Sequence, residues 1–306
     1  MKILIATEKP FAKVAIEGIK KVFDEAGYEL KLLEKYTTKQ ELINAVKDAN
    51  ALIVRSDKVD REVIEAAKDL KIIVRAGAGY DNIDLNASTE KGIVVMNTPG
   101  QNANGVAELT IGLMIFMSRG QFKGVSGNEI KGKKLGLHGY GYVGKAIAKL
   151  AKGFDMEVYA HRRTYIPEEF EKDNVKYVAD VKELYKTCNF ISINIPLTEQ
   201  TKNSVNYDLM SLMPQNALLV NTARKEIVCE DSLKRMFEER PDFKYATDVM
   251  PNCHNELLKY ELRYFATAKK QGAETAEANI NAGIAAAKQI VAFFKFNDRT
   301  FQVNKL

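Results

Sequence analysis

Residues 135–163 read LGLHGYGYVGKAIAKLAKGFDMEVYAHRR, and this stretch decides the fold. LGLH is a short apolar run typical of a strand, and glycines follow it in the spacing G-x-G-x-x-G. From Val143 onward apolar residues recur at helical spacing, and a second strand-like run, MEVYA, follows at 156–160. The stretch therefore predicts a strand–turn–helix–strand unit of a parallel sheet.

The glycines of this turn predict a dinucleotide site. Glycine permits the tight turn, lets a pyrophosphate approach the backbone, and allows close contact between helix and strand. The helix N-terminus adds free N–H groups and a positive dipole. We expect Gly139, Gly141, Tyr142, Val143 and Gly144 to bind the cofactor. The alternative is an ordinary glycine-rich turn.

The second strand ends at His161, and Arg162 and Arg163 follow it. An NAD site usually has an acid here, which accepts hydrogen bonds from the adenosine ribose, whereas an arginine pairs with the 2′-phosphate of NADP. Residues 160–164 contain no acid. The sequence therefore favours NADP(H), bound by Arg162 and Arg163. The alternative is NAD(H) beside two solvated arginines.

Composition limits the class of protein. A chain of 306 residues with 46% hydrophobic content suggests two domains with cores of their own. The 45 basic and 40 acidic residues give a net charge of +5. Lysines lie among acids in helical stretches, which is typical of a solvated surface rather than of a nucleic-acid binder. The longest apolar run, 109–117, is too short to span a bilayer, so no membrane association is expected.

The three cysteines have no metal-type spacing, so no metal site is expected. Their sparse, odd number suggests free thiols in a reducing compartment. The N-terminal residues MKILIATEKP resemble a first strand rather than a signal peptide. We therefore expect a cytoplasmic protein.

Strand-like and helix-like segments alternate along the whole chain, which predicts the α/β class with two Rossmann- or flavodoxin-like, doubly wound parallel sheets. A helix at 103–119 separates two series of strands. The predicted strands lie at 3–7, 30–34, 51–55, 71–75 and 93–97, and then at 134–138, 156–160, 190–194, 217–221 and 244–249. We predict domains at 1–100 and 101–284. A last helix at 275–295 leads to FQVN at 301–304, and we expect 285–306 to return to the first domain.

Several further motifs appear in order along the chain. They are RAGAGYDNIDL at 75–85, NTPGQNANGVAEL at 97–109, NIPLTEQTKNSV at 194–205, LVNTARKE at 219–226 and TDV at 247–249. With the glycine turn, they make the chain resemble the D-2-hydroxyacid dehydrogenases over nearly its full length. It is most similar to the short-type D-3-phosphoglycerate dehydrogenases. The resemblance implies that 1–100 with 285–306 binds substrate, that 101–284 binds the dinucleotide, and that the protein is a homodimer, with helix 103–119 as a plausible contact.

The resemblance also implies roles for single residues. Arg224 matches the catalytic arginine, whose guanidinium holds the substrate carboxylate and polarises the carbonyl. The backbone at Ala76 and Gly77 matches the loop that binds this carboxylate, where small residues let amides approach an anion. Asn102 lies in the loop that faces the substrate in relatives.

Arg55 and Ser56 match positions that contact the substrate phosphate in phosphoglycerate dehydrogenases, and Arg75 ends the adjacent strand. Phosphate is the functional candidate for the arginines, and a structural carboxylate is the alternative.

Three positions match those that border the nicotinamide and its ribose: Thr222, Ala223 and Asp248.

One part of the family pattern is missing. The family ends its site with a Glu–His pair, but Cys253 occupies the glutamate position and 267–278, TAKKQGAETAEA, contains no histidine. Alignment puts Lys270, or Lys269 when counted from the other end, in the histidine slot. Lysine, with a pKa of about 10.4 in isolation, is charged without the partner that imidazole needs. The alternatives are an inactive site, or His254 with Glu256 acting instead.

We therefore expect an NAD(P)-dependent oxidoreductase that transfers a hydride between the cofactor and 3-phosphoglycerate or 3-phosphohydroxypyruvate, as in serine biosynthesis. One alternative is an NADPH-dependent glyoxylate or hydroxypyruvate reductase. An alternative from another class of protein is a dinucleotide-sensing binding protein that has lost its catalytic activity.

Overall fold

The computed structural model describes residues 1–305, which form two compact units. The first consists of Met1–Asn102 with residues 275–305, and the second of Ala103–Glu274. The return to the first unit thus begins ten residues before the predicted position, 285. That position lies inside one continuous helix, α12 (Ala276–Phe296), which Thr275 caps by accepting a hydrogen bond from the Ala278 N–H at 3.1 Å. The whole of this helix belongs to the first unit.

The first unit contains a five-stranded sheet in the order β2-β1-β3-β4-β5, with every neighbouring pair parallel. Its strands are β1 (Lys2–Thr7), β2 (Glu29–Glu34), β3 (Ala51–Val54), β4 (Ile72–Arg75) and β5 (Val94–Asn97). Its other helices are α1 (Lys13–Ala26), α2 (Lys39–Val46), α3 (Arg61–Ala66) and α4 (Leu85–Glu90).

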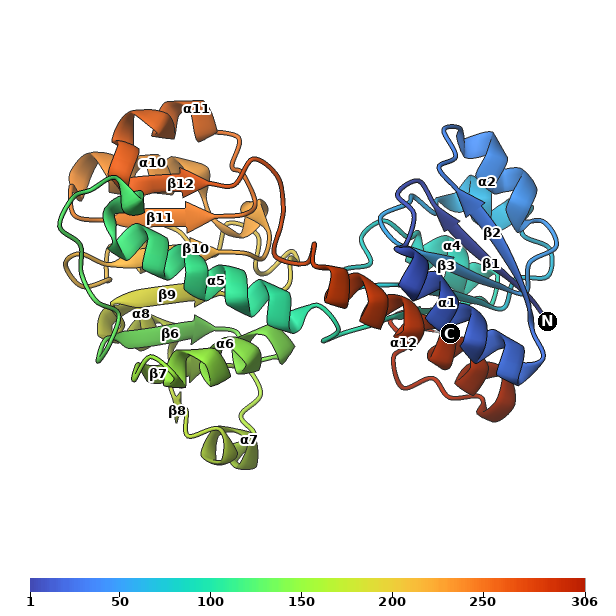
Figure 1. Ribbon diagram of the computed structural model, residues 1–306. Helices are drawn as coiled ribbons and strands as arrows, with labels where there is room; N and C mark the ends of the chain where they lie inside the picture. Colours follow the sequence, from blue (N-terminus) through green and yellow to red (C-terminus); the bar gives the residue numbers. More distant parts are fainter. Residues whose placement is uncertain (306) are drawn as a thin grey trace. The chain divides into compact units, whose positions relative to one another are not determined.

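Apolar side chains of this sheet alternate between two cores, as the two-residue period of a strand requires. Ile3 and Ile5 belong to the core that α1 and α12 cover. Leu4 and Ala6 belong to the opposite core, beneath α2, α3 and α4. Figure 1 shows α1 and α12 side by side on one face of this sheet. Helices on both faces bury the sheet and leave its strand ends for loops.

The tail at 301–304 returns to the first sheet without forming a strand. It lies against β5 through one antiparallel bridge between Met96 and Gln302. Val303 donates its N–H to Val95 O at 2.8 Å, and the Asn304 side chain accepts the Val95 N–H at 2.8 Å. The Asn304 amide therefore occupies a position that a backbone carbonyl would take in a strand.

The second unit contains a seven-stranded parallel sheet in the order β12-β11-β10-β9-β6-β7-β8. Its strands are β6 (Lys134–His138), β7 (Glu157–His161), β8 (Lys176–Tyr177), β9 (Phe190–Ile193), β10 (Leu218–Asn221), β11 (Lys244–Thr247) and β12 (Tyr264–Ala266). The strand order reverses between β6 and β9. Loops at the carboxyl ends of the strands beside such a switch point form the usual ligand crevice of an open α/β sheet.

Helices cover both faces of this sheet as well (Figure 1). One core contains residues of α5 (Ala103–Ser118) and α6 (Tyr142–Lys152), and the other contains residues of α8 to α11. The remaining elements are η1 (Gly120–Phe122), α7 (Pro167–Lys172), α8 (Val181–Thr187), α9 (Tyr207–Met210), η2 (Lys225–Ile227), α10 (Glu230–Glu239), α11 (His254–Leu257) and η3 (Leu258–Arg263). The expected fold class, two doubly wound parallel-sheet domains, is confirmed.

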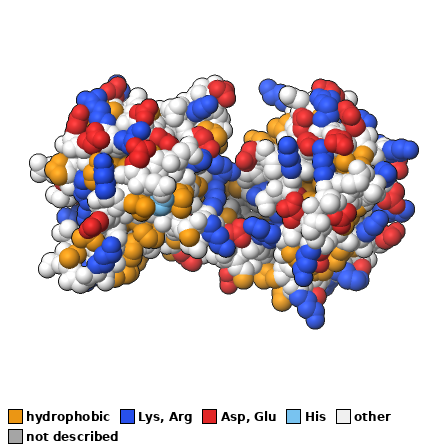
Figure 2. All heavy atoms as spheres, turned by 90° about the horizontal axis from the view of Figure 1, so that it is seen from above, with side chains coloured by type: hydrophobic (Ala, Val, Ile, Leu, Met, Phe, Trp, Pro, Cys, Tyr) orange, Lys and Arg blue, Asp and Glu red, His pale blue; other side chains and the backbone are white. Residues whose placement is uncertain are grey.

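Charged side chains of both signs mix on the surface. On the face drawn in Figure 2, lysines and arginines lie among aspartates and glutamates over each unit. Among residues 1–305, every helix is too short or too polar to cross a membrane.

Candidate active site

The glycine turn joins β6 to α6 and cannot accept larger side chains at two of its positions. Gly139 has φ +108°, and a Cβ there would lie 2.7 Å from the Asn194 carbonyl oxygen. A Cβ on Gly144 would lie 2.4 Å from Gly139 O. Gly141 differs, because a Cβ built on it meets no atom within 4 Å. The turn is therefore closed against the protein at Gly139 and Gly144 and open at Gly141.

Helix α6 begins directly after this open position. Its N-cap residue is Gly141, so no side chain caps the first turn. Tyr142 is 59% exposed, whereas Val143 packs against the core. An eleven-residue helix with an uncapped N-terminus beside an open glycine offers N–H groups and a positive dipole to a pyrophosphate. These residues fit a dinucleotide.

The end of β7 lies against the turn, because Gly139 donates its N–H to His161 O at 3.0 Å. Arg162 follows and forms an ion pair with Glu169 of α7. Lys145 of α6 binds the other oxygen of Glu169 at 2.7 Å. Arg163 is exposed and has no hydrogen bond or ion pair among the described residues. An acid is thus present beside Arg162, although the sequence around 160–164 contains none.

At the end of β11, Asp248 is completely buried. Its Oδ2 accepts the N–H groups of Gly272 at 2.8 Å and Gln271 at 3.2 Å, whereas its Oδ1 has no hydrogen-bond partner among the described residues. Burial raises the pKa of this carboxyl; the Gly272 N–H and the charges of Lys270 and Arg224 oppose the shift. A buried oxygen without a protein partner can accept a hydrogen bond from water or from a ligand hydroxyl, such as that of a ribose.

The two predicted catalytic cations meet at one carbonyl group. Arg224 Nη1 donates to Ala223 O at 3.0 Å, and Lys270 Nζ donates to the same oxygen at 3.2 Å. The preceding residue, Thr222, is buried and lies 3.2 Å, Oγ1 to Oγ1, from Thr110 of α5. The loops after β10 and β12 therefore bring Arg224 and Lys270 together at the carboxyl end of the sheet.

The other candidate proton donors are placed differently. Lys269 is exposed, and of this residue only the backbone oxygen has a contact, with the Thr267 hydroxyl at 2.7 Å. His254 Nδ1 lies 2.8 Å from the Tyr264 hydroxyl, and Glu256 lies 3.7 Å from Lys234. Cys253 is buried, and burial raises its thiol pKa to about 11, so it cannot replace a carboxylate. The geometry favours Lys270 over these groups.

In the first unit, the two predicted phosphate-binding arginines contact each other. Arg75 Nε donates to Arg55 O at 3.0 Å. The Arg55 guanidinium donates to Lys9 O at 3.2 Å and to Asn279 Oδ1 at 2.5 Å, and it lies 5.3 Å from the centre of the Phe11 ring. Arg75 is the last residue of β4, as predicted, whereas Arg55 follows β3, which ends one residue earlier than predicted. The structure thus adds Asn279 of α12, which the sequence did not indicate.

The predicted carboxylate donors need correction. The Ala76 N–H donates to Val54 O at 2.8 Å, and the Gly77 N–H donates to Arg75 O at 2.9 Å, so both are already used. Gly77 has φ +147°, and any side chain there would overlap the Arg75 guanidinium. The next two N–H groups, of Ala78 and Gly79, make no hydrogen bond among the described residues. The loop can therefore receive a carboxylate, but two residues later than predicted.

A buried acid that sequence analysis missed braces this end of the first unit. Asp57 is 4% exposed and accepts hydrogen bonds from the Glu8 N–H at 2.6 Å, the Tyr36 hydroxyl at 2.9 Å and the Arg55 N–H at 3.1 Å. Ser56 beside it is exposed. The only sequence signal for Asp57 was an acidic residue shortly after the end of a predicted strand.

Asn102, the predicted substrate-facing residue, lies in the turn before α5. It is the last residue of Met1–Asn102, the N-terminal segment of the first unit.

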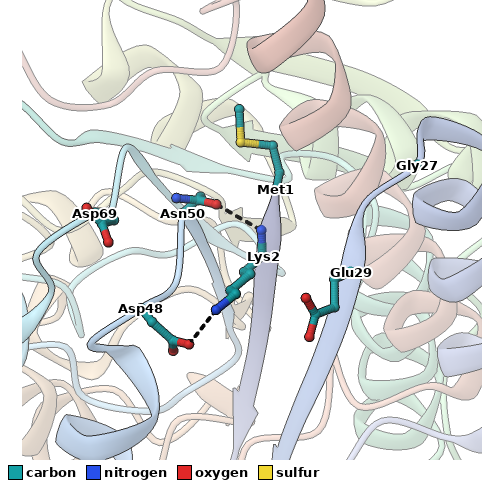
Figure 3. A pocket seen from close by; sticks show the side chains of 7 residues that line it. All are labelled: Met1, Lys2, Gly27, Glu29, Asp48, Asn50 and Asp69. Carbon is teal, nitrogen blue, oxygen red and sulfur yellow. Dashed lines mark hydrogen bonds and ion pairs between the residues drawn. The ribbon is translucent and has the colours of Figure 1, made fainter.

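A pocket elsewhere in the first unit is not this site. It lies at the amino ends of β1 and β2 and is lined by Lys2, Glu29, Asp48, Asn50 and other residues (Figure 3). Lys2 pairs with Asp48 at 3.0 Å within it. Ligands of parallel α/β sheets bind at the opposite, carboxyl ends of the strands.

No cluster of three or more metal-ligating side chains occurs in the described part of the chain.

Comparisons with known proteins agree with this geometry. Residues 111–263 match the family model described as D-isomer specific 2-hydroxyacid dehydrogenase, NAD binding domain. A hydroxypyruvate reductase of Thermotoga maritima is 37% identical over 281 residues, covering 86% of this chain and 90% of that protein. A D-3-phosphoglycerate dehydrogenase of Methanocaldococcus jannaschii is 40% identical over 274 residues, covering 83% of this chain. This chain spans only 51% of that relative's length.

A solved structure is similar over the full chain. It is the NAD⁺-bound 3-phosphoglycerate dehydrogenase of Entamoeba histolytica, with a TM-score of 0.91 and 48% identity, covering 100% of this chain and 99% of that one. The protein belongs to the D-isomer specific 2-hydroxyacid dehydrogenase family. Its second unit contains the nicotinamide-dinucleotide-binding domain of that family.

Proposed function

We propose that the protein is an oxidoreductase that transfers a hydride between a nicotinamide cofactor and 3-phosphoglycerate or 3-phosphohydroxypyruvate. In this proposal the first unit is the substrate-binding domain and the second the dinucleotide-binding domain. One observation carries it: Arg224 and Lys270 both donate to Ala223 O, and both charges act on the buried Asp248. A fixed pair of cations suits an anionic keto acid.

The cofactor supplies or accepts the hydride. Arg224 holds the carboxylate and polarises the carbonyl, because its guanidinium is a fixed fork of donors. Lys270 gives a proton to the carbonyl oxygen during reduction and takes it back during oxidation. Asp248 accepts a hydrogen bond from a ribose hydroxyl of the cofactor, and Thr222 and Ala223 lie beside the nicotinamide.

Arg55, Ser56 and Arg75 bind the substrate phosphate. The hydrogen bond from Arg75 to the Arg55 carbonyl, at 3.0 Å, supports a joint role. The loop that contains Ala76 and Gly77 receives the carboxylate through its later N–H groups, and Asn102 lies beside the substrate.

The test is a spectrophotometric assay that pairs NADH and NADPH with phosphohydroxypyruvate, hydroxypyruvate and glyoxylate. The highest kcat/KM is expected with phosphohydroxypyruvate. Higher values with the other two acids would contradict the phosphate assignment. No hydride transfer with any of them would leave a dinucleotide-binding protein without chemistry.

A hydroxypyruvate or glyoxylate reductase is the second candidate. The 37% identity of the Thermotoga hydroxypyruvate reductase supports this candidate. The Arg55 guanidinium also has protein partners, Lys9 O and Asn279. A non-phosphorylated substrate would leave Arg55 to these structural contacts.

For the cofactor, we propose a preference for NADP(H) over NAD(H). Arg162 and Arg163 follow β7, and no acid lies at 160–164. A charge-assisted contact with the 2′-phosphate contributes ~1.5–3 kcal/mol, roughly tenfold or more in affinity. Titration with both reduced cofactors is the test, and Arg162→Asp should reverse the order. Tighter binding of NADH to the unmodified protein would contradict the preference.

We also propose a homodimer with α5 at its contact, and a cytoplasmic location. The partly buried apolar side chains Leu109, Ile115 and Phe116 of α5 support the contact. The free thiols of Cys188, Cys229 and Cys253 support a reducing compartment. Light scattering should give twice the 34.3 kDa chain mass, and cell fractionation checks the location.

A further inference from the structure

We propose that Glu169, on α7, limits the preference for NADP(H) over NAD(H) by competing with the 2′-phosphate for Arg162. The idea rests on the proposed dinucleotide function. In most NAD sites the acid at this place follows the second strand directly. Here Arg162 and Arg163 follow the strand, and the acid comes from the following helix, seven residues beyond Arg162.

The contacts tie Glu169 to both cations of the region. One carboxylate oxygen pairs with Arg162, and the other lies 2.7 Å from Lys145 Nζ, in the first helical turns of α6. The Lys145 hydrogen bond and the nearby charges lower the pKa of Glu169, although burial opposes this. The carboxylate is therefore ionised near neutral pH and neutralises part of the positive charge that the sequence places there.

Helix α7 is held firmly enough to keep this acid in position. Phe170, the neighbour of Glu169, is 2% exposed, and its ring centre lies 4.6 Å from that of Tyr140. The Tyr140 hydroxyl donates to Asp173 at the end of α7 at 2.6 Å. Tyr140 lies inside the glycine turn, between Gly139 and Gly141. The turn that receives the pyrophosphate therefore anchors the helix that carries Glu169.

The two cofactors differ in what they require of this carboxylate. The 2′-phosphate of NADP carries negative charge, so it must displace Glu169 from Arg162 or bind beside a like charge. The ribose hydroxyl of NAD requires neither, because it is a neutral donor that a carboxylate can accept. Glu169 therefore lowers NADP(H) affinity and leaves NAD(H) affinity nearly unchanged or slightly improved.

The experiment compares Glu169→Gln with a matched control, Glu168→Gln. Glu168 is the adjacent acid of the same helix, is exposed, and has no ion pair among the described residues. Affinities for NADPH and NADH are measured by equilibrium fluorescence titration without substrate, and circular dichroism checks folding. Glu169→Gln should tighten NADPH binding about tenfold and change NADH binding less than about twofold, since tenfold corresponds to about 1.4 kcal/mol. Glu168→Gln should change neither affinity.

Several results would overturn the proposal. They are an equal shift for both cofactors, an unchanged affinity ratio, or the same effect from Glu168→Gln. A double variant tests whether Glu169 acts through Arg162. In an Arg162→Gln background, Glu169→Gln should increase NADPH affinity less than it does in the unmodified protein, and an equal increase would contradict competition for Arg162. Failure of the proposed dinucleotide function gives a different result, because then the unmodified protein binds neither cofactor. Loss of hydride transfer alone leaves this binding test unaffected.

Discussion

The two parallel sheets of this protein have the same architecture but differ in how the polar groups at the carboxyl ends of their strands are hydrogen-bonded. In the first unit, Asp57 accepts three hydrogen bonds, and the N–H groups of Ala76 and Gly77 bind neighbouring carbonyls. In the second, Gly141 faces open space and Asp248 Oδ1 lacks a partner among the described residues. The first end is braced mainly by contacts within the protein and leaves the N–H groups of Ala78 and Gly79 without a partner among the described residues, whereas the second leaves an open glycine and a buried carboxylate oxygen. The same fold therefore prepares the ends of its strands in two different ways.

The largest effect is expected where the cations of the second unit meet. Lys270→Ala should lower kcat by ~10²–10⁴, because proton transfer by a positioned group contributes that much. Cofactor affinity should persist, since the glycine turn is untouched. The measurement is steady-state kinetics beside a dinucleotide titration.

Lys269→Ala is the matched control, and it should leave kcat nearly unchanged. If Lys269→Ala lowers kcat instead, Lys269 rather than Lys270 is the proton donor, one residue earlier than the geometry favours. Normal rates in both variants would remove the lysine from the mechanism.

A second variant pair separates the closed and open positions of the glycine turn. Gly144→Ala introduces a Cβ 2.4 Å from Gly139 O, so the turn must shift, and both stability and dinucleotide affinity should fall, the affinity by roughly tenfold or more. Gly141→Ala meets no protein atom within 4 Å, so it should keep the Tm and lose only affinity. Thermal melts and titrations measure the two quantities. Equal loss of Tm in both variants would contradict the open cradle.

In the first unit, Arg55→Ala should raise KM for phosphohydroxypyruvate far more than for hydroxypyruvate. Loss of a charge-assisted contact costs ~1.5–3 kcal/mol, roughly ten- to hundredfold. Asn279→Ala is a useful companion, because it removes a partner of the Arg55 guanidinium and leaves the charge. A similar rise of KM for both substrates would assign Arg55 to structure alone.

The smallest effect concerns the pKa of Asp248, which burial raises. When a carboxyl has a higher pKa in the folded than in the unfolded protein, its ionisation destabilises the fold. The penalty is fully present above the folded-state pKa and is lost as the pH falls from the folded-state pKa to the unfolded-state pKa. Asp248→Asn should therefore raise the Tm at neutral pH by about 2–4 °C, and the gain should vanish in acid. Calorimetry across this range measures it. A gain that is the same at every pH would assign the effect to packing.

Much of the fold and part of the site followed from local sequence. The alternation of strands and helices and the glycine spacing predicted two parallel sheets, because periodicity and backbone freedom are local properties. The shortest strands were not predicted, because β8 has two residues and β12 three, which are too few to show a hydrophobic period. The return at 285 was wrong because a helix boundary depends on its cap, Thr275, and on what the whole helix packs against.

The sequence by itself determined the family, the glycine cradle, and the presence of Arg224 and of two lysines, Lys269 and Lys270, in a segment that contains no histidine. These are carried by residue type and spacing along the chain. Only the tertiary structure decided which lysine lies beside Arg224, which loop N–H groups remain for a carboxylate, and that Glu169 pairs with Arg162. The reason is physical: hydrogen bonds and ion pairs join residues from different loops and helices, and their partners are fixed by packing, not by neighbours in sequence.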